Sequence, residues 1–260
     1  MKRNLFPNSS ARFYLLTIFT FFIIIYGCSK KPSVEPGTVT DVDGNVYKTV
    51  KIGDQLWMAE NLKVTHYRNG DEIPNITNEE EWYNLNSIGA YCSYNNSDSN
   101  KSVYGLLYNG YAVQDKRGLA PKGWHIPTDE EWMTLEKNLG VDESELQKYG
   151  FRTGDIGGRL KSKGTEYWRE PNSGATNETG FSALPGGCRE SLDGIFKYMT
   201  RIACFWTCTG CSERKSGGRI LKLDKNKHSW FRQIRFDRAS INRFSNRNIE
   251  GYSVRCVKDD

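Results

Sequence analysis

One segment in the middle of the chain constrains the fold more than any other: Pro121 to Leu135, with the sequence PKGWHIPTDEEWMTL. Pro127 ends an extended stretch, because a proline pushes the residue before it out of helical backbone angles. Thr128 and Glu131 have the spacing of a capping box, in which hydroxyl and carboxylate each accept a hydrogen bond from a free N–H at a helix start. We therefore predict a helix that begins directly after Thr128.

Aromatic residues flank this predicted helix start. Trp132 and Leu135 are three residues apart and fall on one helix face, and Trp124 lies just before the helix. The pattern predicts a part of the hydrophobic core. Glu130 and Glu131 are neighbours and point to different sides of the helix, so local geometry does not make them a catalytic carboxylate pair.

The N-terminus has the features of a targeting segment. Lys2, Arg3 and Arg12 precede an apolar run from Phe13 to Tyr26, which is short for a membrane span. The run ends just before Cys28 and resembles a bacterial lipoprotein signal, in which the peptide is cut before a cysteine that then carries lipid. An uncleaved single-span anchor is the alternative.

We therefore expect three parts: a signal peptide at 1–27, a polar tether at 28–38 and a single domain at 39–260. Loss of the signal peptide removes three positive charges and no acidic residue, which lowers the formal net charge from +5 to +2. A charge this small argues against a nucleic-acid partner. The mature protein is expected to be an outer-membrane lipoprotein anchored through Cys28. It is expected to face the periplasm, because lysines rather than acidic residues follow the anchor.

Cysteines are the most informative reactive residues in the mature chain. In an oxidising envelope they predict up to three disulfides, and the sequence leaves their pairing open. A zinc site made by Cys188, Cys204, Cys208 and Cys211 is the alternative; exported thiols usually oxidise, and the cluster contains a single C-x2-C pair. The six candidate disulfide cysteines are Cys92, Cys188, Cys204, Cys208, Cys211 and Cys256.

The remaining pattern predicts helices mainly in the first half and strands in the second. Alternating residues predict a hairpin at 46–58 that could close back on the last strand. Short helices are expected at 78–85, 142–149 and from 157. The expected later strands lie at 181–184, near Cys188, and at 203–207, 220–223, 230–236 and 252–257. With no internal repeat or linker, this order predicts a single α+β domain.

Several motifs together resemble one known family. The motifs in the first half of the chain are VYKTVKIG from Val46, QLWMAENL from Gln55, YGLLYN from Tyr104, GWHIPT from Gly123 and EW from Glu131. Those in the second half are GFSALPGG from Gly180, FWT from Phe205 and SVRCV from Ser253. They resemble the Fibrobacter succinogenes major paralogous domain over roughly residues 39–259. The family looks related to C-type-lectin-like folds and to formylglycine-generating-enzyme domains. The resemblance implies an α+β fold with two main helices around a small twisted antiparallel sheet, paired terminal strands and long loops.

The chain departs from the family pattern at Ala120. Many members have a cysteine there, and the resemblance implies a bond from that cysteine to the one in the last strand. Cys256 must then be free or have another partner. The family brings no established activity, so the resemblance implies architecture and not function.

One tripeptide suggests a ligand site. Glu170, Pro171 and Asn172 match the sequence that mannose-type C-type lectins use for calcium and sugar, and such oxygens suit a hard cation. The Asn-Asp pair that these lectins carry on a following strand is missing, so a plain loop turn is the alternative. With Trp168 and Trp230, which could stack on sugar rings, Glu170 and Asn172 form the candidate ligand set. No cofactor is expected apart from calcium, which such a site would bind.

These observations favour a non-catalytic, lipid-anchored binding or surface-structural module for a glycan or an envelope protein. No catalytic residue is assigned. The alternative is an enzyme related to formylglycine-type oxidases that uses Cys204, Cys208 and Cys211. Residues 214–247 carry 11 Lys and Arg, and we expect them to form a solvated rim rather than a basic binding face.

Overall fold

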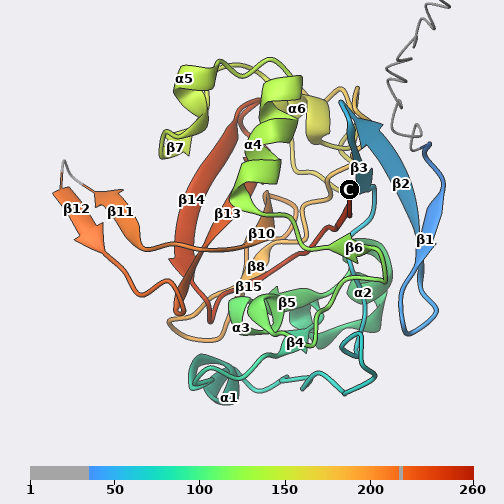
Figure 1. The fold of residues 1–260 in the computed structure, drawn as a ribbon, viewed down its shortest axis with the longest axis vertical. Coiled ribbons are helices and arrows are strands. Elements are labelled where there is room, and N and C mark those ends of the chain that lie inside the picture. Colours follow the sequence, from blue (N-terminus) through green and yellow to red (C-terminus); the bar gives the residue numbers. More distant parts are fainter. Residues whose placement is uncertain (1–34, 217–218) are drawn as a thin grey trace, which may run out of the picture. The chain divides into compact units, whose positions relative to one another are not determined.

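A computed structural model describes residues 35–216 and 219–260 (Figure 1). The predicted signal peptide, Cys28 and most of the predicted tether lie outside the described residues. Within those residues, no helix is both long and apolar enough to cross a membrane.

The opening hairpin and the C-terminus share one sheet. Its strand order is β1-β2-β3-β16-β6, with the predicted hairpin formed by β2 and β3. Val257 on β16 pairs with Trp57 on β3 and with His125 on β6, which confirms that the hairpin closes on the last strand. The bounds are β1 (Thr38–Thr40), β2 (Val46–Ile52), β3 (Gln55–Met58), β6 (Trp124–His125) and β16 (Val257–Lys258).

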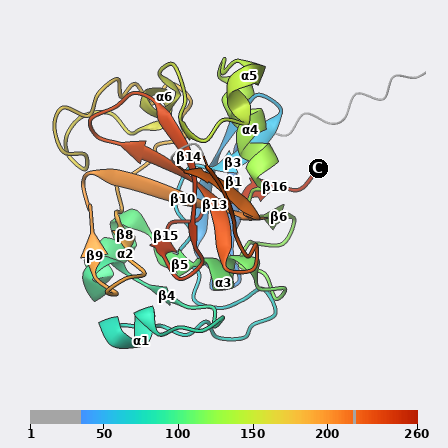
Figure 2. The same cartoon turned by 90° about the vertical axis from the view of Figure 1, so that its left-hand side faces the viewer.

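A four-stranded antiparallel sheet forms the centre of the second half (Figure 2). Its order is β10 (Ile202–Gly210), β13 (His228–Arg235), β14 (Ile241–Arg247) and β7 (Gly150–Phe151). Successive side chains of a strand point to opposite faces. One face therefore packs against helix α4 (Asp129–Asn138), and the other lines a groove described below.

Short strands make up the remaining sheets. One has the order β4-β5-β15-β8-β9, and the pair β11-β12 extends away from the central sheet (Figure 1). The bounds are β4 (Tyr91–Cys92), β5 (Leu107–Asn109), β15 (Gly251–Tyr252), β8 (Cys188–Arg189), β9 (Phe196–Lys197), β11 (Glu213–Ser216) and β12 (Arg219–Lys222).

The predicted capping box is present at the start of α4. Thr128 Oγ1 accepts from the Glu131 N–H at 3.1 Å, and Glu131 Oε2 accepts from the Thr128 N–H at 2.8 Å. The other helical segments are shorter than α4. They are α1 (Glu79–Tyr83), the 3-10 turn η1 (Tyr94–Asn96), α2 (Asp98–Tyr104), α3 (Gly110–Gln114), α5 (Glu143–Leu146) and α6 (Ile156–Leu160).

The predicted fold class, an α+β domain with two main helices around a small sheet, is wrong. The part of the chain that the structure describes is mostly β, with 31% strand against 18% helix, and the six α-helices in that part are short. Capping residues do start helices where expected, but a cap fixes only where a helix begins. Many of the strands contain two to four residues, too few to leave an alternating pattern in the sequence.

Aromatic residues fill the core between the first sheet, α4 and the central sheet. The Trp132 ring lies 4.9 Å from that of Trp57, 5.7 Å from that of Phe181 and 5.8 Å from that of Phe205. All four side chains are fully buried, which confirms the predicted core role of Trp132.

Buried cations hold the irregular loops. Lys161 is fully buried, and its ammonium group donates to the carbonyls of Ser173, Arg235 and Arg238 at 2.8–3.0 Å. Arg189 and Arg255 are also buried and donate to loop carbonyls. These contacts satisfy backbone groups that no strand or helix pairs, and so they let long loops lie inside the domain.

Candidate ligand-binding groove

A groove of about 640 Å³ lies on the face of the central sheet that is turned away from α4. Its floor is formed by β10, β13 and β14, and its wall by the segment that leads from β8 to β10. Figure 2 shows β8 and β9 beside the start of β10, where Gly187 pairs with Ala203. The lining of the groove includes Cys188, Ser191, Tyr198, Cys204, Phe231, Gln233, Asn242, Phe244, Asn246, Glu250 and Tyr252.

Strand register brings like side chains together on the groove floor. The antiparallel pairing of β13 with β14 sets Gln233 opposite Asn242 and Phe231 opposite Phe244. Cross-strand partners on one face lie close enough to contact each other. The floor therefore carries one amide pair and one aromatic pair.

The amide pair is not fully hydrogen-bonded. Asn242 Nδ2 donates to Gln233 Oε1 at 3.5 Å, and Gln233 Nε2 lies 3.8 Å from the sulfur of Cys204. Asn242 Oδ1 is buried and has no partner among the described residues. Buried polar atoms are nearly always hydrogen-bonded, so this oxygen is an acceptor that a ligand could use.

Glu250 forms an acidic wall of the groove. Its side chain is 6% exposed and accepts a hydrogen bond from Ser191 Oγ at 2.6 Å. Burial raises the pKa of Glu250 to about 7; the Ser191 hydrogen bonds oppose this change. Of the charged neighbours, Glu190 raises the pKa and Arg247 lowers it.

We expect Glu250→Gln to remove a pH dependence of stability. Between the unfolded-state pKa of 4.5 and the folded-state pKa of about 7, the folded state keeps a proton that the unfolded state has lost. The free energy of unfolding therefore falls as the pH rises through this window and is level above it. The variant should be more stable than the parent at pH 8, by on the order of 3 kcal/mol, and similar to it at pH 4.

Urea unfolding at both pH values measures this difference. The exposed Glu72→Gln exchange is the matched control and should shift neither value by more than about 0.5 kcal/mol. Equal pH profiles for Glu250→Gln and the parent would contradict the buried, protonated state of Glu250.

The six cysteines of the described chain are free thiols in this structure. Cys188 and Cys204 lie beside the groove, and burial raises the pKa of both thiols. Cys211 is buried too, while Cys208 is partly exposed with a pKa raised by burial to about 11. The described residues contain no group of three or more His, Cys, Asp or Glu side chains that could hold a metal ion.

Cys92 and Cys256 lie in separate parts of the core. Cys92 is buried with the aromatic residues beneath α1. Cys256 belongs to the same buried cluster as Ala120.

The predicted ligand residues lie away from the groove lining. Trp168 is buried and donates its indole N–H to the Ala183 carbonyl. Asn172 is buried and donates to loop carbonyls, whereas Glu170 is exposed. Trp230 lies on the opposite face of β13 from Phe231, with the Arg243 guanidinium 3.6 Å from its ring centre.

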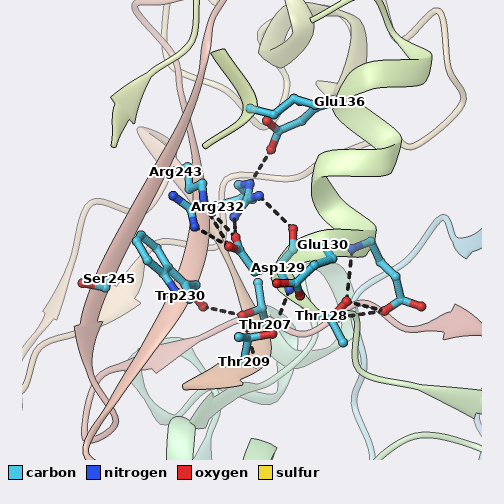
Figure 3. Close-up of polar contacts among 12 residues, drawn as sticks. Thr128, Asp129, Glu130, Glu136, Thr207, Thr209, Trp230, Arg232, Arg243 and Ser245 are labelled. Carbon is cyan, nitrogen blue, oxygen red and sulfur yellow. Dashed lines mark hydrogen bonds and ion pairs between the residues drawn. The ribbon is translucent and has the colours of Figure 1, made fainter. Parts of the chain in front are cut away.

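The face toward α4 carries a buried ion cluster that the sequence prediction missed (Figure 3). Arg232 on β13 donates to Glu136 and, at 2.7 Å, to Asp129. Arg243 on β14 donates to Asp129 at 2.9 Å, and Arg152 to Glu136 at 2.7 Å. These five side chains are at most 6% exposed.

The ion pairs of this cluster connect α4 to the central sheet. Burial raises the pKa of Asp129, but Arg232 and Arg243 together outweigh it and lower the pKa below its usual value. A signal was present in the sequence: Asp129, Trp132 and Glu136 have helical spacing and so share one face of α4. Nothing local identified the two arginine partners on the sheet, Arg232 and Arg243, which are about a hundred residues away from Asp129 along the chain.

Comparison with known proteins gave one match. A family model described as the Fibrobacter succinogenes major domain matches residues 50–258. Neither a curated protein nor a solved structure matches the chain.

Proposed function

We propose that this chain, which belongs to the Fibrobacter succinogenes major domain family, is a non-catalytic binding module that takes a glycan in the groove of its central sheet. The observation that carries the proposal is the amide pair of Gln233 and Asn242, with its buried, unpartnered carbonyl oxygen. Amide groups both donate and accept hydrogen bonds, as sugar hydroxyls do.

Aromatic residues in the groove support a sugar ligand. Phe231 and Phe244 lie beside the amides, and Tyr252 accepts a hydrogen bond from Asn246 at 2.9 Å. A predominantly apolar surface with a few placed polar groups is typical of small-molecule sites. Tyr198, 47% exposed, gives the groove an aromatic rim.

The state of the cysteines favours binding over oxidase chemistry. A cysteine enzyme needs accessible thiols that ionise readily. Cys204 and Cys211 are buried, and burial raises the pKa of Cys204 and of the partly exposed Cys208. A thiol titration of the native protein tests this point, and two rapidly reacting thiols would favour the enzyme.

We expect Gln233→Ala and Asn242→Ala each to weaken glycan binding about tenfold, because each removes hydrogen bonds worth about 1–1.5 kcal/mol. A glycan array identifies the ligand, and calorimetric titration then measures the affinity of each variant. Gln147→Ala is the matched control, since Gln147 is an exposed amide outside the groove, and it should bind as the parent does.

Two results would overturn the groove as the site. One is an array without any ligand above background. The other is a ligand whose affinity is unchanged in both groove variants. Thermal unfolding of each variant shows that a loss of binding is not a loss of fold.

The membrane attachment is part of the same proposal. The lipoprotein-like signal before Cys28 supports an outer-membrane lipoprotein, and Lys30 and Lys31 directly after it support a domain that faces the periplasm. Intact-mass measurement of the mature protein would show the lipid on Cys28, and a mature chain that retains residues 1–27 would contradict it.

A further inference from the structure

A second cavity, the Arg255 pocket, lies between the opening hairpin and the loop that follows α6. Its volume is about 520 Å³, and it shares no lining residue with the groove. Its lining includes Lys48, Val50, Glu60, Lys63, Ser162, Leu184 and Arg255.

Arg255 is a buried cation whose charge has no partner of opposite sign in contact. Its side chain is 1% exposed and donates to Asn61 Oδ1 at 2.8 Å and to the carbonyls of Phe181 and Ser182. All three acceptors are neutral. No carboxylate lies within 4.0 Å of Arg255 among the described residues. An unpaired buried charge is costly unless something compensates it.

Arg189 offers a comparison within this fold, because it uses more of its guanidinium N–H groups than Arg255 does. It makes four hydrogen bonds to backbone carbonyls, from Gly194 and from residues 76–78. Arg255 makes three, so two of its five guanidinium N–H groups have no acceptor among the described residues. The Arg255 guanidinium carbon lies 4.2 Å from the ring centre of Phe181 and 5.3 Å from that of Phe205, and these ring contacts leave the remaining N–H groups at its edge for further hydrogen bonds.

Ser162 supplies an independent observation in the same pocket. Its hydroxyl oxygen is buried and has no partner among the described residues, although a hydroxyl can both donate and accept. Arg255 and Ser162 thus both line the pocket with unused donors. Unused donors around one cavity are complementary to an acceptor-rich ligand group.

Charge favours an anion. The pocket is lined by Lys48, Lys63 and Arg255 against a single carboxylate, Glu60. Glu60 accepts a hydrogen bond from the backbone N–H of Lys48 at 2.7 Å, and its charge favours the protonated form of Arg255 from a distance, so the pocket still carries an excess of positive charge. Guanidinium groups match the planar geometry of a carboxylate, and Val50 and Leu184 offer apolar contact to the rest of a small organic molecule.

We propose that the Arg255 pocket binds a small organic carboxylate. The carboxylate accepts hydrogen bonds from the Arg255 edge and the Ser162 hydroxyl, and Lys63 adds charge at the rim. Two sources carry this group, an acidic sugar and the C-terminus of a peptide.

The test is a calorimetric titration of the full chain, in detergent at constant ionic strength. The probes are sodium D-glucuronate for the acidic sugar, N-acetyl-D-alanine for the peptide carboxylate, and D-glucose as the neutral match. We expect one or both carboxylates to bind and glucose to bind at least tenfold more weakly. Tighter binding of glucuronate would identify an acidic sugar as the ligand, and tighter binding of N-acetyl-D-alanine would identify a peptide C-terminus.

Variants assign the binding to this pocket. Ser162→Ala and Lys63→Gln should each weaken carboxylate binding about three- to tenfold. Lys137→Gln, which removes an exposed lysine on α4, is the matched control and should change nothing. Gln233→Ala should also leave carboxylate binding intact, which keeps this test separate from that of the groove. The proposal is overturned if neither carboxylate binds, or if both pocket variants bind as the parent does.

Discussion

Replacing Glu136 by Gln is expected to lower the free energy of unfolding by about 3–5 kcal/mol, the usual cost of breaking a buried ion pair. Glu136 is fully buried, and its two oxygens accept from Arg152 and Arg232. A glutamine has one acceptor oxygen and no charge. Only one of the two arginines could therefore keep its hydrogen bond to residue 136. If Arg152 loses it, Arg152 is left with carbonyl partners alone, and if Arg232 loses it, Arg232 keeps only Asp129.

Urea unfolding of the variant and parent measures this cost. Glu143→Gln is the matched control, because Glu143 pairs with Lys137 on the surface with its side chain 80% exposed. Exposed pairs contribute about 0–1 kcal/mol, so the control should lie close to the parent. Similar losses for the two variants would show that the buried cluster does not hold α4 to the sheet.

The sequence showed where α4 begins but not what it binds. Thr128 and Glu131 are three residues apart, so their capping box could be read directly from the sequence. Asp129 and Arg243 are 114 residues apart, and their contact depends on the register of β14 on β13. Counting charge in residues 214–247 favoured a solvated rim, whereas Arg232 and Arg243 are buried. Composition gives the sign of a side chain's charge but does not show which side chain it pairs with.

In the candidate site, too, the sequence showed contacts between neighbouring residues but not contacts between separate strands. The tripeptide at Glu170 could be recognised as a candidate ligand site because its three residues are contiguous. In the structure, however, the Asn172 side-chain amide donates to loop carbonyls. Gln233 and Asn242 are nine residues apart on separate strands and meet only because the two strands pair. Nothing in either strand alone indicates a binding groove, since a polar residue on a strand is more often solvated.

Trp132→Ala is expected to cost about 3–5 kcal/mol, the range for removing a large aromatic residue from a core. The ring contacts Trp57, Phe181 and Phe205, so its loss leaves a cavity between two sheets. Trp132→Phe should cost less, about 1–2 kcal/mol. It keeps an aromatic ring in place and removes an indole N–H that is buried without a partner among the described residues.

A double-mutant cycle with Glu136→Gln shows whether the aromatic core and the ion cluster act together. Trp132 and Glu136 share a face of α4, and the Arg232 guanidinium lies 5.9 Å from the Trp132 ring centre. Residues with a common partner usually couple by about 0.5–3 kcal/mol. We therefore expect the double variant to differ by at least about 0.5 kcal/mol from the sum of the single variants. Additive losses would mean that the aromatic contacts and the ionic contacts hold α4 independently of each other. The capping box would then fix only where the helix starts.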